Sequence, residues 1–360
     1  MNKSYGFLLC ALGIVLAFSG CMRNDDEPAY PARPIARLYV SIENYQTDAS
    51  KDDIDNVVLI DPADTLDMYV ALNYNSQALG GAGIHFNPFV SLVFQAGYSI
   101  DTTIRVMTVG KLGTVGTSGS IGHGELRAMR GLVYHRPSEM LYVANNATPT
   151  AIYGFYQPKN KNGFTKPKKV FRLGSEMRPW GMVLWNDSLL VSNSGANGGV
   201  SLYGRLSQTD SLEADFQALS TIRIAGATAI RGIAFVDSLD LLVAADYGTG
   251  SPNEPVADGR VYIIEGIKAH LATPSATVTP TRVISGVSTG LVGPVDVAID
   301  PRGGADRRTI FVADRDERKI SRFKLSASGN VAPETSVVLD TLGNVRRPFG
   351  MFLDVRGEAQ

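Results

Sequence analysis

A recurring pair of apolar segments constrains the fold of this chain more than any other feature of its sequence. About every 50 residues, a Gly-centred apolar segment is followed by a polar turn and by a second apolar segment ending in a small or acidic residue. The clear copies are Arg130–Tyr134 with Leu141–Asn145, Trp180–Leu184 with Leu189–Asn193, and Arg231–Phe235 with Leu241–Asp246. Divergent copies are Val295–Ile299 with Ile310–Asp314, and Phe349–Leu353 alone. Their length and their Val, Ile and Leu content indicate β-strands.

The second segment of the repeat occurs six times, and this count predicts six blades. Its copies begin at Leu38, Leu92, Leu141, Leu189, Leu241 and Ile310. The matching first segments begin near Gly83, Arg130, Trp180, Arg231, Val295 and Phe349. The two series do not pair at the ends of the chain, because Leu38 has no first segment before it and Phe349 has no second segment after it.

These unpaired ends predict how the fold closes. If Phe349–Val355 forms the innermost strand of a blade whose outer strands come from residues 38 to about 72, the two ends of the chain share one blade. Closure of this kind removes the open sheet edges that would otherwise pair with other chains. We therefore predict an all-β, six-bladed β-propeller as a single domain over residues 37–360, with a β-sandwich as the alternative.

One of the later copies of the repeat resembles the blade of a known propeller family. The segments Pro294–Pro301, Ile310–Arg315 and Lys319–Phe323 together look like a blade of the NHL-type or YncE-like propellers. WD and Kelch propellers share this rhythm, so the number of copies carries more weight than any single motif. The resemblance covers most of the mature chain and implies a six-bladed propeller.

The N-terminus is predicted to be a signal peptide over residues 1–20. Lys3 is its charged region, and Phe7–Phe18 is an apolar core too short for a permanent membrane span. Leu16–Cys21 resembles the lipobox of bacterial lipoproteins, with Phe18 in place of the usual Leu. The resemblance implies that Cys21 is lipidated and becomes the first residue of the mature protein, and an ordinary signal peptide is the alternative.

Residues 21–36 are predicted to form a tether. The acidic run Asp25–Glu27 resembles the surface-export signal of Bacteroidota lipoproteins, with a merely solvated linker as the alternative, and Pro28, Pro31 and Pro34 stiffen the chain after it. We expect an outer-membrane location, facing the periplasm or the cell surface. Since Cys10 lies in the signal peptide, only Cys21 remains after cleavage and no internal disulfide can form.

The overall charge argues against nucleic acid as a partner. The chain has 34 Lys and Arg residues and 35 Asp and Glu residues, so it has no general basic field. We therefore expect membrane contact through the lipid anchor, and any charge-based recognition must be local.

Blade geometry predicts which residues share one face of the ring. In an up-and-down blade, the start of the first strand and the end of the second lie at the same end. Strand starts then contribute Arg130, Trp180, Arg231, Val295 and Phe349, and strand ends contribute Glu43, Gln95, Asn145, Asn193, Asp246 and Asp314. Arginine offers forked donors to carboxylates and sulfates, and aromatic rings offer flat apolar faces, so this mouth suits an anionic or glycan ligand.

A purely structural interpretation of the same residues stays open. Arg130 and Arg231 could pair with Asp246 or Glu43 of a neighbouring blade, and the aromatic rings could simply fill the channel. Asn and Asp at strand ends often form turns by accepting hydrogen bonds from nearby backbone.

A metal site is the sharpest alternative for the mouth. Gluconolactonase-like propellers hold a divalent cation with Glu, Asn and Asp, and that likeness would give the role to Glu43, Asn145, Asn193 and Asp246, with Ca²⁺ as a candidate ion. The chain lacks the Glu-Gly-Pro start of that family's first inner strand. The four histidines are scattered without ligand spacing, so we expect no zinc site and no resident cofactor.

Three other patterns carry weaker predictions. The acidic residues Asp48, Asp52, Asp53 and Asp55 could bind calcium, although a solvated loop is the simpler interpretation. Glycines at every third position from Gly110 to Gly122 suggest a flexible connection between the second and third blades. Gly286–Gly290 matches the nucleophile-elbow pattern but has no helix after it, so we predict a turn.

Together these features predict a lipid-anchored propeller that binds a ligand or a protein of the cell envelope without catalysis. A metal-dependent lactonase or related hydrolase using the central funnel is the alternative from a different class. A third possibility is a protein-interaction module that uses the long loop Tyr247–Asp258.

Overall fold

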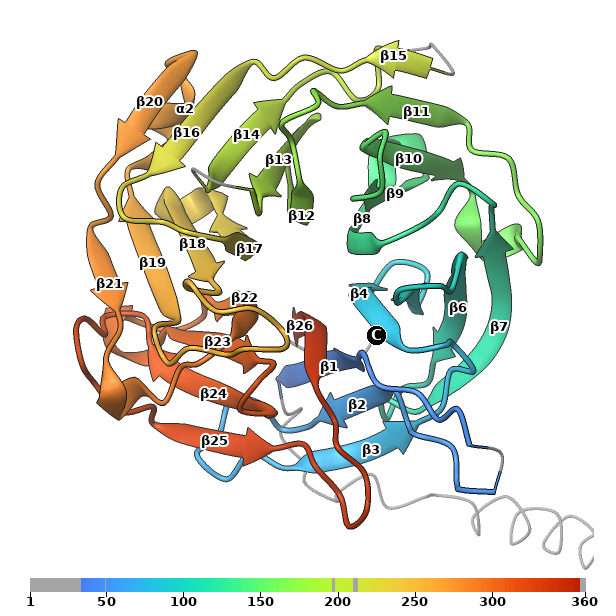
Figure 1. Cartoon of the computed structure of the whole chain (residues 1–360), viewed down its shortest axis with the longest axis horizontal. Helices are drawn as coiled ribbons and strands as arrows, with labels where there is room; N and C mark the ends of the chain where they lie inside the picture. Colours follow the sequence, from blue (N-terminus) through green and yellow to red (C-terminus); the bar gives the residue numbers. More distant parts are fainter. Residues whose placement is uncertain (1–33, 49, 196–197, 210–212, 357–360) are drawn as a thin grey trace, which may run out of the picture. The chain divides into compact units, whose positions relative to one another are not determined.

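The computed structural model describes residues 34–48, 50–195, 198–209 and 213–356. From Ile35 onward the chain forms six blades around a common axis, which confirms the predicted all-β propeller (Figure 1). The first strand begins two residues before the expected domain start at residue 37. The predicted signal peptide and Cys21 lie outside the described residues.

Each blade contains four antiparallel strands that run in order from the axis outward, as Figure 1 shows. The closing blade contains β26 (Pro348–Arg356), β1 (Ile35–Ile42), β2 (Val57–Ile60) and β3 (Val70–Tyr74). The second contains β4 (Gly81–Asn87), β5 (Leu92–Gly97), β6 (Thr103–Val109) and β7 (Val115–Gly122). The third contains β8 (Met129–His135), β9 (Met140–Asn145), β10 (Ala151–Tyr156) and β11 (Lys169–Arg172).

The remaining three blades follow the same order. The fourth contains β12 (Pro179–Trp185), β13 (Ser188–Asn193), β14 (Gly199–Tyr203) and β16 (Ser220–Ile224). The fifth contains β17 (Ile230–Val236), β18 (Leu241–Asp246), β19 (Arg260–Glu265) and β21 (Arg282–Ile284). The sixth contains β22 (Pro294–Asp300), β23 (Thr309–Asp314), β24 (Lys319–Lys324) and β25 (Thr335–Val338).

The ring closes as the unpaired ends of the repeat predict. β26 pairs with β1 from Ile35 opposite Arg356 to Ile42 opposite Pro348. The closing blade therefore takes its inner strand from the C-terminal end of the domain and its outer three strands from the N-terminal end.

Two short strands join neighbouring blades, which the sequence did not reveal. β15 (Glu213–Asp215) precedes β16 in the chain but pairs in parallel with β11 of the third blade. β20 (Ser275–Val278) follows β19 but pairs in parallel with β16 of the fourth blade. Each adds a fifth strand to the outer edge of the preceding blade.

The glycine-rich segment in the second blade corrects one prediction. Residues Val115–Gly122 form β7, the outermost strand of that blade, and Gly113, with φ of +82°, lies in the turn before it. The expectation of a flexible connection was therefore wrong for most of this segment. An outer edge strand buries little, so Gly, Ser and Thr suffice for its pairing with β6.

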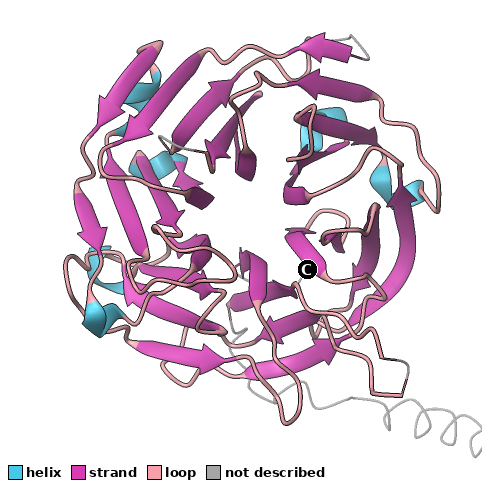
Figure 2. Cartoon of the chain, in the orientation of Figure 1, coloured by secondary structure: helices cyan, strands magenta, loops and turns pink. Residues whose placement is uncertain are grey.

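Helices are few and short among the described residues (Figure 2). The longest is α2 (Ile267–Leu271), within the stretch Glu265–Ala272. Val287–Thr289 forms a single 3-10 turn, as predicted for Gly286–Gly290. In the described part of the chain, no helix is long and apolar enough to cross a membrane.

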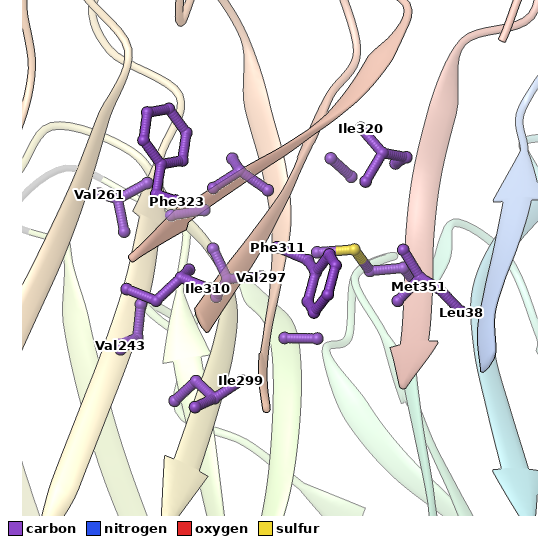
Figure 3. Close-up of a cluster of buried hydrophobic side chains, with 14 of the residues drawn as sticks. Leu38, Val243, Val261, Val297, Ile299, Ile310, Phe311, Ile320, Phe323 and Met351 are labelled. Atoms are coloured by element: carbon purple, nitrogen blue, oxygen red, sulfur yellow. The ribbon is translucent and has the colours of Figure 1, made fainter. Parts of the chain in front are cut away.

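The core lies between the blades. In β23 all six residues are buried, because this strand has a neighbouring blade on each face. Figure 3 shows the side chains of one such region, where Phe311 of the sixth blade, Val243 of the fifth and Met351 of the closing blade belong to one buried cluster. Burial on both faces explains why the second segments of the repeat are continuously apolar rather than alternating.

The glycine of each inner strand marks a close approach to the next inner strand. A Cβ on Gly131 would lie 2.7 Å from the Trp180 carbonyl oxygen, and one on Gly181 would lie 2.8 Å from the Ile233 nitrogen. The strand pairing also shifts register at these positions. Five blades have glycine here and the sixth has aspartate, so we call Gly83, Gly131, Gly181, Gly232, Asp296 and Gly350 the glycine ring.

Candidate functional site

The residues that precede the glycine ring meet at one end of the channel. The rings of Trp180 and Phe349 stack with centroids 5.0 Å apart, and both side chains are buried. The Arg130 guanidinium carbon lies 4.5 Å from the centre of the Trp180 ring, and that of Arg231 lies 4.0 Å from it. The structure thus brings together four of the predicted mouth residues from four different blades. Val295 is fully buried in the core instead.

Two tyrosines that the repeat did not point to complete this group. Tyr98 contacts Phe349 edge-on at 5.2 Å, and Tyr247 lies under Arg231 at 4.0 Å. We call Tyr98, Arg130, Trp180, Arg231, Tyr247 and Phe349 the mouth cluster. Tyr98 and Tyr247 each follow the last residue of a second strand, and an aromatic residue at that position was the signal that could have identified them.

The two arginines of the mouth cluster lack acidic partners. The Nε atoms of Arg130 and Arg231 are buried and make no hydrogen bond, while Arg130 Nη1 donates to the Met129 carbonyl oxygen at 2.9 Å. Among the described residues, neither arginine forms an ion pair. Burial lowers the pKa of each to about 10, which still leaves both charged at pH 7. The mouth therefore holds two partly desolvated positive charges.

A buried ion network borders the mouth cluster and uses the nearby carboxylates. Arg315 donates to both oxygens of Glu43, at 2.8 and 2.5 Å, and to Asp316 at 2.7 Å. Tyr247 donates its hydroxyl proton to Asp316 at 2.5 Å. Burial opposes the charge of Arg315, but the hydrogen bonds and charge of Glu43 raise its pKa above the ordinary value. This network ties the sixth blade to the closing blade.

The polar residues at strand ends share one structural role. Asn145 accepts the Arg127 N–H at 2.8 Å, Asn193 accepts the Arg178 N–H at 2.9 Å, and Asp246 accepts the Ala229 N–H at 2.7 Å. Asp314 accepts the Val292 and Gly293 N–H groups at 2.8 and 3.0 Å. Each side chain fixes the loop that leads into the inner strand of its own blade. Gln95 differs, since it donates to Ser41 and to the Asn56 carbonyl oxygen, both at 2.8 Å.

The candidate metal ligands do not fit a cation site. Glu43 is held by Arg315, and the oxygens of Asn145, Asn193 and Asp246 face backbone N–H groups of their own blades. Across the part of the chain that the structure describes, no three His, Cys, Asp or Glu side chains are grouped as metal ligands would be.

The acidic loop after β1 also uses its carboxylates locally. Asp48 accepts hydrogen bonds from the backbone and hydroxyl of Ser50, which lower its pKa. Asp53 accepts from Asn75 at 3.1 Å, and Asp55 pairs with Arg346 at 3.3 Å. These contacts agree with a solvated loop.

The described residues define the class of this protein: an all-β, six-bladed propeller with an arginine and aromatic cluster at one end of its channel. No protein-family model matches the sequence, and no curated protein matches it. Solved structures share the fold. A protein from Bacteroides fragilis, provisionally named a 6-phosphogluconolactonase, is 12% identical with a TM-score of 0.52 over 91% of this chain and 100% of that one.

Two further structures give the same result. A protein from Bacteroides uniformis with the same provisional name is 12% identical, with a TM-score of 0.51 over 89% of this chain and 99% of its own. A protein from Lactobacillus plantarum has the same values. At this identity the similarity shows the propeller fold alone.

Proposed function

We propose that this protein is a binding module whose mouth cluster holds an anionic ligand, such as a small molecule or glycan that bears carboxylate or sulfate groups. The observation that carries the proposal is the pair of half-buried guanidiniums without acidic partners, Arg130 and Arg231, whose Nε atoms are buried without a hydrogen bond. A buried charge is costly unless it is paired, and a bound anion would supply the missing partner. Trp180 contacts both guanidiniums and keeps the two charges close together, so that one anion can reach both.

The chemistry around the mouth cluster favours binding over catalysis. Glu43 and Asp316, the carboxylates beside it, both pair with Arg315. Burial and the hydrogen bond to Asp316 raise the pKa of Tyr247, so its hydroxyl stays protonated. A hydrolase would need a free general base beside the ligand, and the described mouth residues offer none.

The binding test compares anionic and neutral ligands by titration calorimetry. Glucuronate and 6-phosphogluconate should bind, and glucose should bind at least about tenfold more weakly. Arg130→Gln and Arg231→Gln should each weaken anion binding about tenfold or more, because each removes a charged forked donor. Arg307→Gln, on an exposed turn, is the matched control and should bind as the wild type does. Undiminished binding by the Arg130→Gln, Arg231→Gln double variant would refute the proposal.

Hydrolysis of a sugar lactone is the second candidate. Two structural neighbours carry the provisional name 6-phosphogluconolactonase, which implies a phosphorylated, anionic substrate. A mouth that holds anions would also suit such a lactone. Acid release from 6-phosphogluconolactone, above the spontaneous rate and lost in Arg231→Gln, would favour this candidate over simple binding.

A protein partner remains a third candidate, because the loop Tyr247–Asp258 follows directly on the mouth cluster. If the loop captures an envelope protein, Val256→Asp should abolish capture while Arg231→Gln leaves it intact. If the mouth cluster binds an anionic ligand instead, Arg231→Gln should weaken binding and Val256→Asp should leave it unchanged.

We further propose that the mature protein is anchored to the outer membrane by a lipid on Cys21. The support is the segment Leu16–Cys21 and the acidic tether after it. Cys21→Ser should move the protein from the membrane fraction to the soluble fraction and abolish incorporation of labelled palmitate. Cys10→Ser is the matched control, since this residue would leave with the signal peptide. Membrane retention of the Cys21→Ser protein would contradict the anchor.

A further inference from the structure

A cavity lies in the channel on the side of the glycine ring that faces away from the mouth cluster. It has a volume of about 310 Å³ and is lined by ring residues and by the three or so residues that follow them in each inner strand. Its walls are aliphatic and aromatic, with Phe235 and Phe352 among them. Only two polar side chains, Asp296 and His85, line it in the described part of the chain. The size suits a small organic ligand.

Asp296 takes the ring position that glycine occupies in the other five blades. Its carboxylate accepts the Val297 N–H at 2.9 Å and the Met351 N–H at 2.7 Å, which links the sixth blade to the closing blade. The side chain remains partly accessible from the channel. Burial raises its pKa to about 7, and the two backbone donors only partly oppose this effect.

No cation of the described residues balances this carboxylate. The strands packed against β22 are β17, β18, β23 and β26. Their ionisable residues are Arg231, Asp246, Asp314, Asp354 and Arg356, and none of them forms a hydrogen bond or ion pair with Asp296. An ionised Asp296 is therefore a partly desolvated negative charge without a counter-ion at the wall of an apolar cavity.

His85 does not fill this role either. Its Nε2 accepts the Tyr134 N–H at 3.3 Å, and its ring meets Phe352 edge-on at 4.6 Å. Burial lowers its pKa to about 3, so the ring is neutral at physiological pH and carries its proton on Nδ1. That nitrogen has no partner among the described residues and is left for a ligand.

We propose that this cavity is a second binding site, specific for a small organic cation, namely an amine with an apolar body whose ammonium group pairs with Asp296. The ammonium supplies the missing counter-charge, and the carbon body replaces water against the apolar walls. The rings of Phe235 and Phe352 line the same cavity and add apolar surface for the carbon body of the ligand. His85 can donate one hydrogen bond to a hydroxyl or carbonyl group on the same ligand. The two ends of the channel then select ligands of opposite charge.

The test uses benzylamine as the probe and benzyl alcohol as an uncharged probe of the same shape. Calorimetric titration at pH 8 should show benzylamine binding and at least about tenfold weaker benzyl alcohol binding. Between pH 8 and pH 5.5, benzylamine affinity should fall roughly 30-fold, which is the change in the ionised fraction of a carboxyl with a pKa of about 7. Asp296→Asn should lose benzylamine binding, and Asp306→Asn, the same charge change on an exposed turn, should keep it.

A second variant covers the case in which Asp296→Asn does not fold. Ala234 lines the cavity and is partly accessible, so Ala234→Phe should block it sterically without touching the carboxylate. Failure of the wild type to bind benzylamine at pH 8, or full binding by either variant, would overturn the proposal and leave a water-filled channel with a structural aspartate. Anion binding at the mouth cluster should be unchanged in both variants, so the two sites fail or succeed separately.

Discussion

Four residues of the mouth cluster, Arg130, Trp180, Arg231 and Phe349, lie directly before glycine-ring residues on the same inner strands, yet the two positions are under different constraints. The residue before the ring varies freely among Ala82, Arg130, Trp180, Arg231, Val295 and Phe349. At the ring itself only glycine and one aspartate occur, because each neighbouring inner strand approaches to contact distance. One position is therefore set by sterics, and the position beside it is free to carry recognition chemistry.

The largest effect should come from adding a side chain to the ring. A Cβ at Gly181 would meet the Ile233 nitrogen at 2.8 Å and the Arg231 carbonyl oxygen at 2.9 Å, and backbone atoms cannot move aside cheaply. Gly181→Val should lower the free energy of unfolding by about 3 kcal/mol or more, measured by urea denaturation. Gly124→Ala is the control, since no atom lies within 4 Å of its added Cβ, and should change stability by no more than about 0.5 kcal/mol. Equal stability of the two variants would disprove the close-approach account of the repeat.

A smaller and pH-dependent effect is expected at the one ring position that is not glycine. The pKa of Asp296 rises from 3.8 to about 7 on folding because of burial, so the folded state holds a proton that the unfolded state has lost between these values. The stability contributed by the protonated form is complete below pH 4 and is lost as the pH rises through 7. We expect the free energy of unfolding to fall by about 2 kcal/mol between pH 4 and pH 7. This is less than the full shift in pKa implies, because the carboxyl faces the channel, where solvent weakens the effect of burial.

Asp296→Asn should remove this dependence, since an amide does not titrate. Thermal unfolding of both proteins from pH 4 to pH 8 would measure it. Parallel pH profiles for the two proteins would show that Asp296 titrates normally.

The smallest effect on stability should come from the mouth cluster, with the opposite sign. Burial lowers the pKa of Arg231, so its charge destabilises the unliganded fold. Arg231→Met keeps much of the packing on Trp180 and should raise the free energy of unfolding by about 1 kcal/mol while anion binding is lost. Arg307→Met, at an exposed position, should alter neither property. A destabilised Arg231→Met protein would mean that the cation contacts are structural.

Much of the fold was predictable because the same burial requirement recurs in every blade. A second strand such as Leu241–Asp246 is covered on both faces by neighbouring blades, so it must be apolar throughout and is easy to count. The unpaired segments at Leu38 and Phe349 then implied a shared closing blade. Arg130, Trp180, Arg231 and Phe349, each of which precedes a glycine, could likewise be placed at the mouth, because all inner strands run in the same direction.

Other features had no such local signal. The ion pairs of Arg315 depend on which loops meet across blades. The parallel strands β15 and β20 pair with a preceding blade that the repeat does not mark. The strand-end residues Asn145 and Asp246 suggested metal ligands by residue type, but their hydrogen bonds to local backbone give them a structural role.

The sequence by itself therefore determined the number of blades, their closure and the identity of four mouth residues. It could do so because burial on both faces and close backbone approach each produce a recurring sequence pattern, the apolar second strand and the glycine of the inner strand. Only the tertiary structure decided the chemical state of those residues. Whether Arg130 and Arg231 have partners, and whether Asp296 is solvated, depends on side chains brought together from separate blades. Desolvation and charge pairing are properties of that assembled environment, so no single repeat encodes them.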